Sequence, residues 1–344
     1  MANEVPTLDE WRRLYAAAGR VKEMAPWTWM KETDIFGVQD PETGTLGFVS
    51  VMGAQGEHFA VAVYLRAEGL YHFWSYQVLG SKARVEDMLS IPQLHASFEN
   101  RDQLSDQDRQ VIEELGLKFR EEQAWPLFQS YRPGYMPWFL EPGEARFLTI
   151  ALEQLLEVAP RFRADAALFP PPYEERYLVR VSRSEGEAVL WEDSIVPVPQ
   201  PEARPIQITI DPADLNAVER LPREGSQLEM DCAMILSGMQ EERGARPVFP
   251  YLLMAVDAGS GLILDQNMLA VKTTPDALWA EVPGHVLHLL LRIGRVPGEI
   301  AMRSPQLFNV LTPLAGRLKI RLVPARRLPA LERAWQSVLG FMQR

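Results

Sequence analysis

Three side chains able to bind a metal fall on one face of a predicted helix. Glu281, His285 and His288 stand at i, i+4 and i+7, and a carboxylate with two imidazoles can hold zinc or another transition metal. Pro283 interrupts that register, and the set lacks the His-Glu-x-x-His pattern of zinc proteases. We therefore favour an ordinary amphipathic surface, and we predict no metal and no cofactor.

Two further carboxylates, Asp257 and Asp265, flank a predicted hairpin. If both projected to one side they could coordinate a hard cation. The letters "DAGSG" at 257–261 are also typical of a turn, because aspartate caps the turn and glycine supplies a positive φ. We interpret Asp257 as a turn residue.

A basic set near the C-terminus could neutralise phosphates. Its members are Arg317, Lys319, Arg321, Arg326 and Arg327. The alternating letters "RLKIRLV" at 317–323 predict an exposed edge strand with three of these side chains on one face. Protection of that edge against aggregation accounts for them equally well.

Two other clusters invite a functional interpretation. Residues 125–140 gather six aromatic side chains around three prolines and could form a recognition surface, but burial of the rings against a core is the commoner outcome. The segment "GAQGEH" at 53–58 leads into a predicted strand, which favours a hairpin turn over a phosphate loop. His58 and His72, on neighbouring predicted strands, could approach each other.

The composition is that of a folded globule, with 344 residues of which 47% are hydrophobic and 24% charged. No window approaches the roughly 18 apolar residues of a membrane helix, and the N-terminus lacks a signal-peptide pattern. The single cysteine, Cys232, excludes an intramolecular disulfide. We expect a cytoplasmic protein without a membrane segment.

The net charge of −11 is unevenly distributed. Residues 1–222 carry the excess acid and are not expected to bind nucleic acid, whereas residues 223–344 hold more basic than acidic side chains. The basic end could therefore bind an anion, a nucleic acid or an acidic protein partner. A solubility charge is the simpler explanation, and we favour it.

The order of apolar runs and turn signals predicts three parts. Residues 1–168 are expected to form an α+β domain with an antiparallel meander, its strands near 35–40, 46–53, 58–66, 71–78 and 95–100 and its helices at 7–24, 105–117 and 142–158. Residues 169–226 are expected to be a Pro-rich connection with a hairpin, a strand and a helix. Residues 227–344 give the order βββαβαβα in a mixed sheet.

That last order resembles the ribonuclease H-like fold of nucleases and integrase cores. The resemblance implies an α/β domain in which carboxylates bind two metal ions. Carried over by position, Asp231 matches the first carboxylate and Glu332 the third, whereas Arg303 stands at the second. A cation at that place argues against catalysis.

The whole chain also resembles a group of uncharacterised bacterial proteins that join two domains of unknown function. The resembling stretches are 27–65, 128–140 and the last block.

These observations favour a non-enzymatic binding or regulatory protein with a degenerate ribonuclease H-like domain. The alternatives are a metal-dependent phosphodiesterase or nuclease using Asp231, Asp257 and Glu332, and anion or nucleic-acid binding through the basic end. The missing motifs support the first interpretation, because the sequence has no Gly-x-Ser-x-Gly, no Walker loop and no dinucleotide fingerprint.

Overall fold

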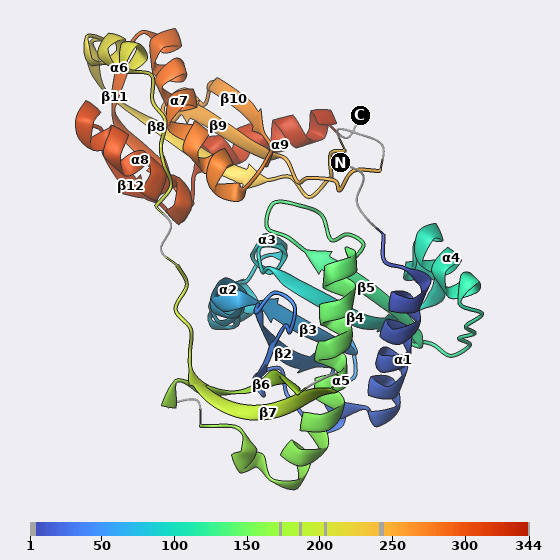
Figure 1. Cartoon of the computed structure of the whole chain (residues 1–344). Helices are drawn as coiled ribbons and strands as arrows, with labels where there is room; N and C mark the ends of the chain where they lie inside the picture. The colour runs from blue at the N-terminus through green and yellow to red at the C-terminus, as the bar shows by residue number, and fades with distance from the viewer. Residues whose placement is uncertain (1–4, 172–173, 186–187, 203–204, 241–243, 343–344) are drawn as a thin grey trace. The chain divides into compact units, whose positions relative to one another are not determined.

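The computed structural model describes residues 5–171, 174–185, 188–202, 205–240 and 244–342 (Figure 1). The chain folds into two compact units: Met1–Ala203 with Glu242–Arg246, and Arg204–Glu241 with Pro247–Arg344. Each unit is built on its own mixed β-sheet, so the chain is a mixed alpha/beta protein.

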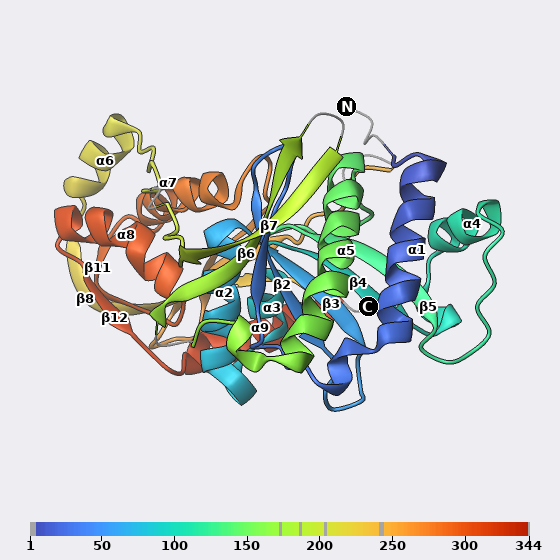
Figure 2. The ribbon, with the colours of Figure 1, turned by 60° about the horizontal axis from the view of Figure 1, so that its bottom comes forward.

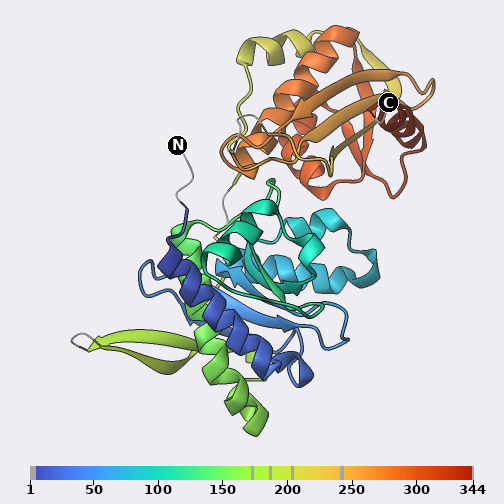
Figure 3. The ribbon, with the colours of Figure 1, turned by 90° about the vertical axis from the view of Figure 1, so that its right-hand side faces the viewer.

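The first unit has a seven-stranded sheet in the order β5-β4-β3-β2-β1-β6-β7. All neighbours are antiparallel except β1 and β6, which are parallel. Its strands are β1 (Phe36–Gln39), β2 (Leu46–Met52), β3 (Ala60–Leu65), β4 (Gln93–Glu99), β5 (Trp125–Tyr131), β6 (Arg176–Glu185) and β7 (Ala188–Pro197). Figure 3 shows the yellow-green hairpin β6–β7 standing out from the rest of this unit.

Helices cover both faces of the first sheet. On one face, α1 (Leu8–Met24) and α5 (Pro142–Ala164) run beside each other (Figure 2) and pack on the strand residues Val49 and Val61. On the other face, α2 (Arg66–Leu79) packs on Phe48 and Ala62. Because side chains alternate along a strand, these neighbouring positions serve opposite cores. The short helices α3 (Val85–Leu89) and α4 (Asp106–Glu114) complete the unit, with the 3-10 turn η4 (Ala166–Leu168) after α5.

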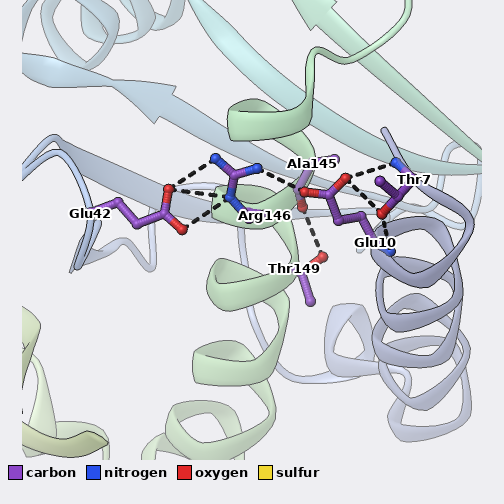
Figure 4. Close-up of polar contacts among 6 residues, drawn as sticks. All are labelled: Thr7, Glu10, Glu42, Ala145, Arg146 and Thr149. Carbon is purple, nitrogen blue, oxygen red and sulfur yellow. Dashed lines mark hydrogen bonds and ion pairs between the residues drawn. The ribbon is translucent and has the colours of Figure 1, made fainter. Parts of the chain in front are cut away.

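The start of α1 is tied to α5 by an ion-pair network (Figure 4). Thr7 and Glu10 form a capping box, which satisfies free N–H groups at the first turn of α1. The same Glu10 accepts a hydrogen bond from Arg146 of α5 at 2.7 Å, and Arg146 reaches Glu42 at 2.9 Å on its other side. A local capping signal is thereby joined to a tertiary contact.

One predicted strand of the first unit is wrong, because residues 71–78 lie within α2. Arg66 adopts a left-handed φ of 58°, which ends β3 and turns the chain into the helix. Leu70 and Phe73 then point to the sheet at a helical spacing of three. Gly69 allows close approach, since a Cβ there would lie 2.7 Å from the carbonyl oxygen of Pro92. The other predicted strands near 35–40, 46–53, 58–66 and 95–100 are confirmed as β1 to β4, and the predicted hairpin pairs with β1 through β6.

The second unit has a five-stranded sheet in the order β10-β9-β8-β11-β12. Neighbours β10, β9 and β8 are antiparallel, whereas β8, β11 and β12 are parallel. The strands are β8 (Arg223–Met234), β9 (Tyr251–Asp257), β10 (Ile263–Leu269), β11 (Val296–Met302) and β12 (Arg321–Pro324). The helices are α6 (Pro212–Glu219), α7 (Pro275–Ile293), α8 (Pro305–Leu318) and α9 (Pro329–Met342). In the described residues of both units, none of the helices combines the length and hydropathy that crossing a bilayer requires.

The predicted strand at 317–323 is shorter than expected. Helix α8 continues to Leu318, Lys319 closes it in a left-handed conformation, and only Arg321–Pro324 forms the edge strand β12. Leu311, Leu314 and Leu318 are buried at helical spacing, and this period prevails over the alternating letters that follow. The three basic side chains therefore do not share one strand face.

Candidate functional site

An arginine lies between two carboxylates at one end of the second sheet. Asp231 is on β8 and Arg303 directly follows β11, and the parallel pairing of Glu229 with Ala301 brings the two positions into register. Arg303 Nε donates to Asp231 Oδ2 at 3.0 Å, and Arg303 Nη1 lies 3.5 Å from Glu332 Oε1 on α9. The three positions that the ribonuclease H-like resemblance carried over are neighbours in the fold.

Each acid of this cluster receives a donor from the chain. The Asp231 side chain is only 9% exposed, and its Oδ1 also accepts from the Cys232 N–H at 3.1 Å. The adjacent buried Glu229 accepts from the Leu331 N–H at 2.8 Å. That amide belongs to the first turn of α9, where the helix dipole favours a negative charge.

The chemistry of this cluster is that of a structural ion pair. A guanidinium carries five N–H donors, has no acceptor and stays charged at any physiological pH, so Arg303 can neither take up a proton nor ligate a metal. Its positive charge also opposes the entry of a second cation between the carboxylates. Among the residues that the structure describes, no group of three or more His, Cys, Asp or Glu side chains could hold a metal ion.

Asp257 forms the turn between β9 and β10. Its Oδ1 accepts from the Ser260 N–H and from the Ser260 hydroxyl, both at 2.8 Å, and these hydrogen bonds lower the pKa of Asp257 below its usual value. Asp265 pairs instead with Arg292 at 2.6 Å. The turn interpretation is confirmed, and the two carboxylates of the hairpin have separate partners.

The face of α7 that carries Glu281, His285 and His288 is regular, because the helix runs through Pro283 without ending. The three side chains nevertheless have different neighbours. Glu281 is 3.4 Å from Lys272, His288 is 3.0 Å from Asp214, and His285 lines a small void of about 10 Å³ beside Met230.

The basic set is dispersed over three local structures: the end of α8, its cap and the segment from β12 onward. Lys319 and Arg326 are exposed. The other three side chains have acidic partners, which are Glu219 for Arg317, Glu299 for Arg321 and Glu332 for Arg327. These partners already offset part of the positive charge that a phosphate would need.

In the first unit, His58 and His72, which could have approached each other on neighbouring strands, have different neighbours. His72 lies on α2 and contacts the carbonyl of Ser90, whereas His58 stacks on His95 of β4 with ring centroids 5.6 Å apart. Burial is the larger cause and the nearby His58 the smaller, and together they lower the pKa of His95 to about 3. His95 is thus a neutral imidazole in the folded protein at physiological pH.

The aromatic segment 125–140 is partly a strand. Residues 125–131 form the edge strand β5, and Ser130 pairs through its backbone with Trp138. Of the six aromatic residues, Phe128 is buried and the other five are half-buried. Packing, as in the 5.1 Å contact between the rings of Trp138 and Phe139, is the role that the structure supports.

A larger cavity lies elsewhere in the first unit, at residues that the sequence analysis did not single out. It measures about 860 Å³ and opens between the segment before β1, α2, the end of α5 with η4, and the start of β6. Its walls are mainly aromatic and aliphatic, and the five aromatic members are Phe73, Trp74, Phe162, Phe169 and Tyr177. Charged and polar side chains stand among its lining residues, including Asp34, Gln77 and Arg176.

Two family models match the chain. Residues 11–180 match the model described as domain of unknown function DUF7309, and residues 214–339 match the model described as domain of unknown function DUF6930. The chain therefore joins two domains of these kinds. No curated protein matches the sequence.

Of the Arg303 cluster and the cavity, only the Arg303 cluster was anticipated from the sequence. Asp231, Arg303 and Glu332 were assigned through the ribonuclease H-like resemblance, which rests on an order of elements that local patterns can provide. The cavity walls come from four separate segments, and one of them, 71–78, was predicted to be a strand. An unusual density of aromatic letters at 71–76, "YHFWSY", was the one local signal.

Proposed function

We infer that the chain is a non-enzymatic cytoplasmic binding or regulatory protein whose second unit is a catalytically degenerate ribonuclease H-like domain. The described elements of that unit, from β8 to α9, run in the order βββαβαβα, and their sheet is mixed. Both features agree with what the resemblance implies.

The observation that carries the proposal is the contact of Arg303 with both carboxylates. A two-metal site needs converging carboxylates whose negative charge is left for the ions. Here the guanidinium lies 3.0 Å from Asp231 and 3.5 Å from Glu332, so a permanent cation belonging to the chain occupies the space between them. The acids are retained as a structural contact.

A nuclease using Asp231, Asp257 and Glu332 has less support. In the β8–β9 pairing, Asp257 stands opposite Leu228 and Asp231 stands opposite Met254. Three residues of strand separate the two carboxylates along the ladder, or about 10 Å. Two catalytic metal ions lie only about 4 Å apart, so ligands at this spacing do not serve one centre.

Two measurements test the proposal. The full chain is incubated with Mg²⁺ or Mn²⁺ and labelled single-stranded DNA, duplex DNA and RNA, and no cleavage is expected. In thermal-shift assays the wild type should not respond to Mn²⁺, whereas Arg303→Asp should gain about 1–3 kcal/mol from it, because a third carboxylate would replace the cation. Arg321→Asp is the matched control, since it changes the same charge beside Glu299 alone.

Cleavage by the wild type that depends on a divalent ion and is lost in Asp231→Asn would refute the proposal. Salt-sensitive binding of nucleic acid without cleavage, lost when Lys319 and Arg326 are both changed to Ala, would favour the basic end instead.

A further inference from the structure

We propose that the cavity of the first unit is a binding site for a neutral, planar, largely apolar small molecule. The site is formed within one compact unit and stands independently of the Arg303 cluster in the other. Its volume of about 860 Å³ lies within the range of about 300–1,000 Å³ that small-molecule sites occupy.

The walls of the cavity are held in place by ring contacts. Phe162 and Phe169 are stacked with centroids 4.4 Å apart, and Phe169 also stacks on the fully buried Phe36 of β1. On the other side, the rings of Trp74 and Tyr177 are near-parallel, at 23°. Rings anchored in this way lose little freedom when a ligand binds, so the site is preorganised.

The lining chemistry specifies an uncharged ligand. The Phe162–Phe169 and Trp74–Tyr177 pairs offer a planar ligand surfaces to stack on. Asp34 already accepts the Lys31 N–H at 2.7 Å. Burial raises the pKa of Tyr177 to about 12, which keeps its hydroxyl protonated.

The charged lining residues are exposed or already bonded. Glu175 and Arg176 are exposed, adjacent and opposite in sign, so they do not select an ionic ligand. At the rim of the cavity, the Val198 N–H donates a hydrogen bond to the Glu175 carbonyl at 2.9 Å, which fixes the backbone there. A ligand gains most here by burying apolar surface.

Val78 gives the cavity an apolar edge. Val78 is 88% exposed and is one of the residues that line the cavity. Ala166 and Ala167 of η4 line the cavity as well and are small and exposed, which keeps this side open.

The test uses the uncharged fluorescent probe N-phenyl-1-naphthylamine with the full-length chain. Its emission rises on entering an apolar site, and we expect saturable binding with one site per chain. Val78→Glu and Ala167→Glu should each raise the dissociation constant at least tenfold, since each places a carboxylate in the cavity lining.

Matched controls make the same side-chain changes outside the cavity. Val85→Glu on α3 and Ala164→Glu at the end of α5 alter exposed residues that do not line it, and both should bind the probe like the wild type. The anionic analogue 8-anilinonaphthalene-1-sulfonate should bind more weakly than the neutral probe.

Three results would overturn the proposal. The wild type could fail to bind the probe saturably, or the cavity variants could bind it as well as their controls do. The third result is a dimer, seen in sedimentation, that Val78→Glu dissociates, together with no binding of the probe. This surface would then be an interface between two copies of the chain.

Discussion

Replacing Arg303 by methionine should destabilise the second unit by about 2 kcal/mol. The change keeps much of the side-chain volume but removes the donor at 3.0 Å from Asp231 Oδ2. The Asp231 carboxylate, whose side chain is 9% exposed, then keeps the hydrogen bond from the Cys232 N–H but loses the one from Arg303. A hydrogen bond to a charged group contributes about 1.5–3 kcal/mol, and the 38% exposure of Arg303 places this one toward the lower end.

A double-mutant cycle separates this interaction from the packing of the two side chains. Asp231→Leu alone should cost less than Arg303→Met, because Arg303 retains Glu332 and reaches water. In the double variant both members of the Asp231–Arg303 pair are gone, so neither is left buried without the other, and the cost should fall below the sum of the single costs by about 2 kcal/mol.

Scanning calorimetry of the full chain measures the effect, with the second unit followed as its own transition. At about 3 °C per kcal/mol for a unit of this size, Arg303→Met should lower that transition by about 6 °C. Arg321→Met, which removes an exposed ion pair with Glu299, is the control and should cost less than about 1 kcal/mol. Equal shifts for Arg303→Met and Arg321→Met, or strict additivity in the cycle, would refute the reasoning.

Three further predictions concern single side chains. Because the pKa of His95 is lowered from 6.5 to about 3 in the folded protein, the unfolded chain binds this proton first as the pH falls, and the folded protein loses stability. Between about pH 7 and about pH 5, urea titrations should show that His95→Gln loses about 2 kcal/mol less stability than the wild type. Equal losses in the two proteins would contradict this. Burial raises the pKa of Cys232 to about 12, so a thiol reagent should label the native protein at least about 100-fold more slowly than the urea-unfolded chain, and similar rates would show that the thiol is accessible. Gly69→Ala should destabilise the first unit by about 1–3 kcal/mol, because the new Cβ would lie 2.7 Å from the Pro92 carbonyl oxygen. Gly19→Ala in α1 is the control: its new Cβ has no neighbour within 4 Å, so the change should stabilise the unit by about 0.5–1 kcal/mol. Thermal shifts of the same sign for the two variants would contradict this reasoning.

Local signals in the sequence were sufficient to predict the helices and strands whose ends are marked by capping or turn residues. Thr7 and Glu10 mark the beginning of α1, and Thr274 with Pro275 marks that of α7. The order of strands in the second unit followed in the same way, because each strand is bounded by turn residues such as Asp257. That order carried the ribonuclease H-like resemblance, and the resemblance put Arg303 at the place of a carboxylate beside Asp231; the parallel pairing of β8 and β11 brings the two positions together.

Tertiary contacts decided the elements that were predicted wrongly. At 71–78 the letters favour a strand, because aromatic side chains are common in strands. The helix prevails because Leu70 and Phe73 at helical spacing reach Tyr64 and Phe48, which face them from β3 and β2. Neither contact is visible in a window of eight residues.

The same replacement of strand by helix explains why the cavity could not be foreseen. In a strand, Phe73 and Trp74 would point to opposite faces of the sheet, and at most one of them could line a given cavity. On a helix, consecutive residues are only about 100° apart, so Phe73 can pack on the sheet core while Trp74 reaches Tyr177 and both border the same space. Val78, one turn further, then follows on the same side and lines the cavity while exposed. The ligand site that we propose therefore depends on α2, an element of the first unit whose secondary structure the sequence pattern misidentified.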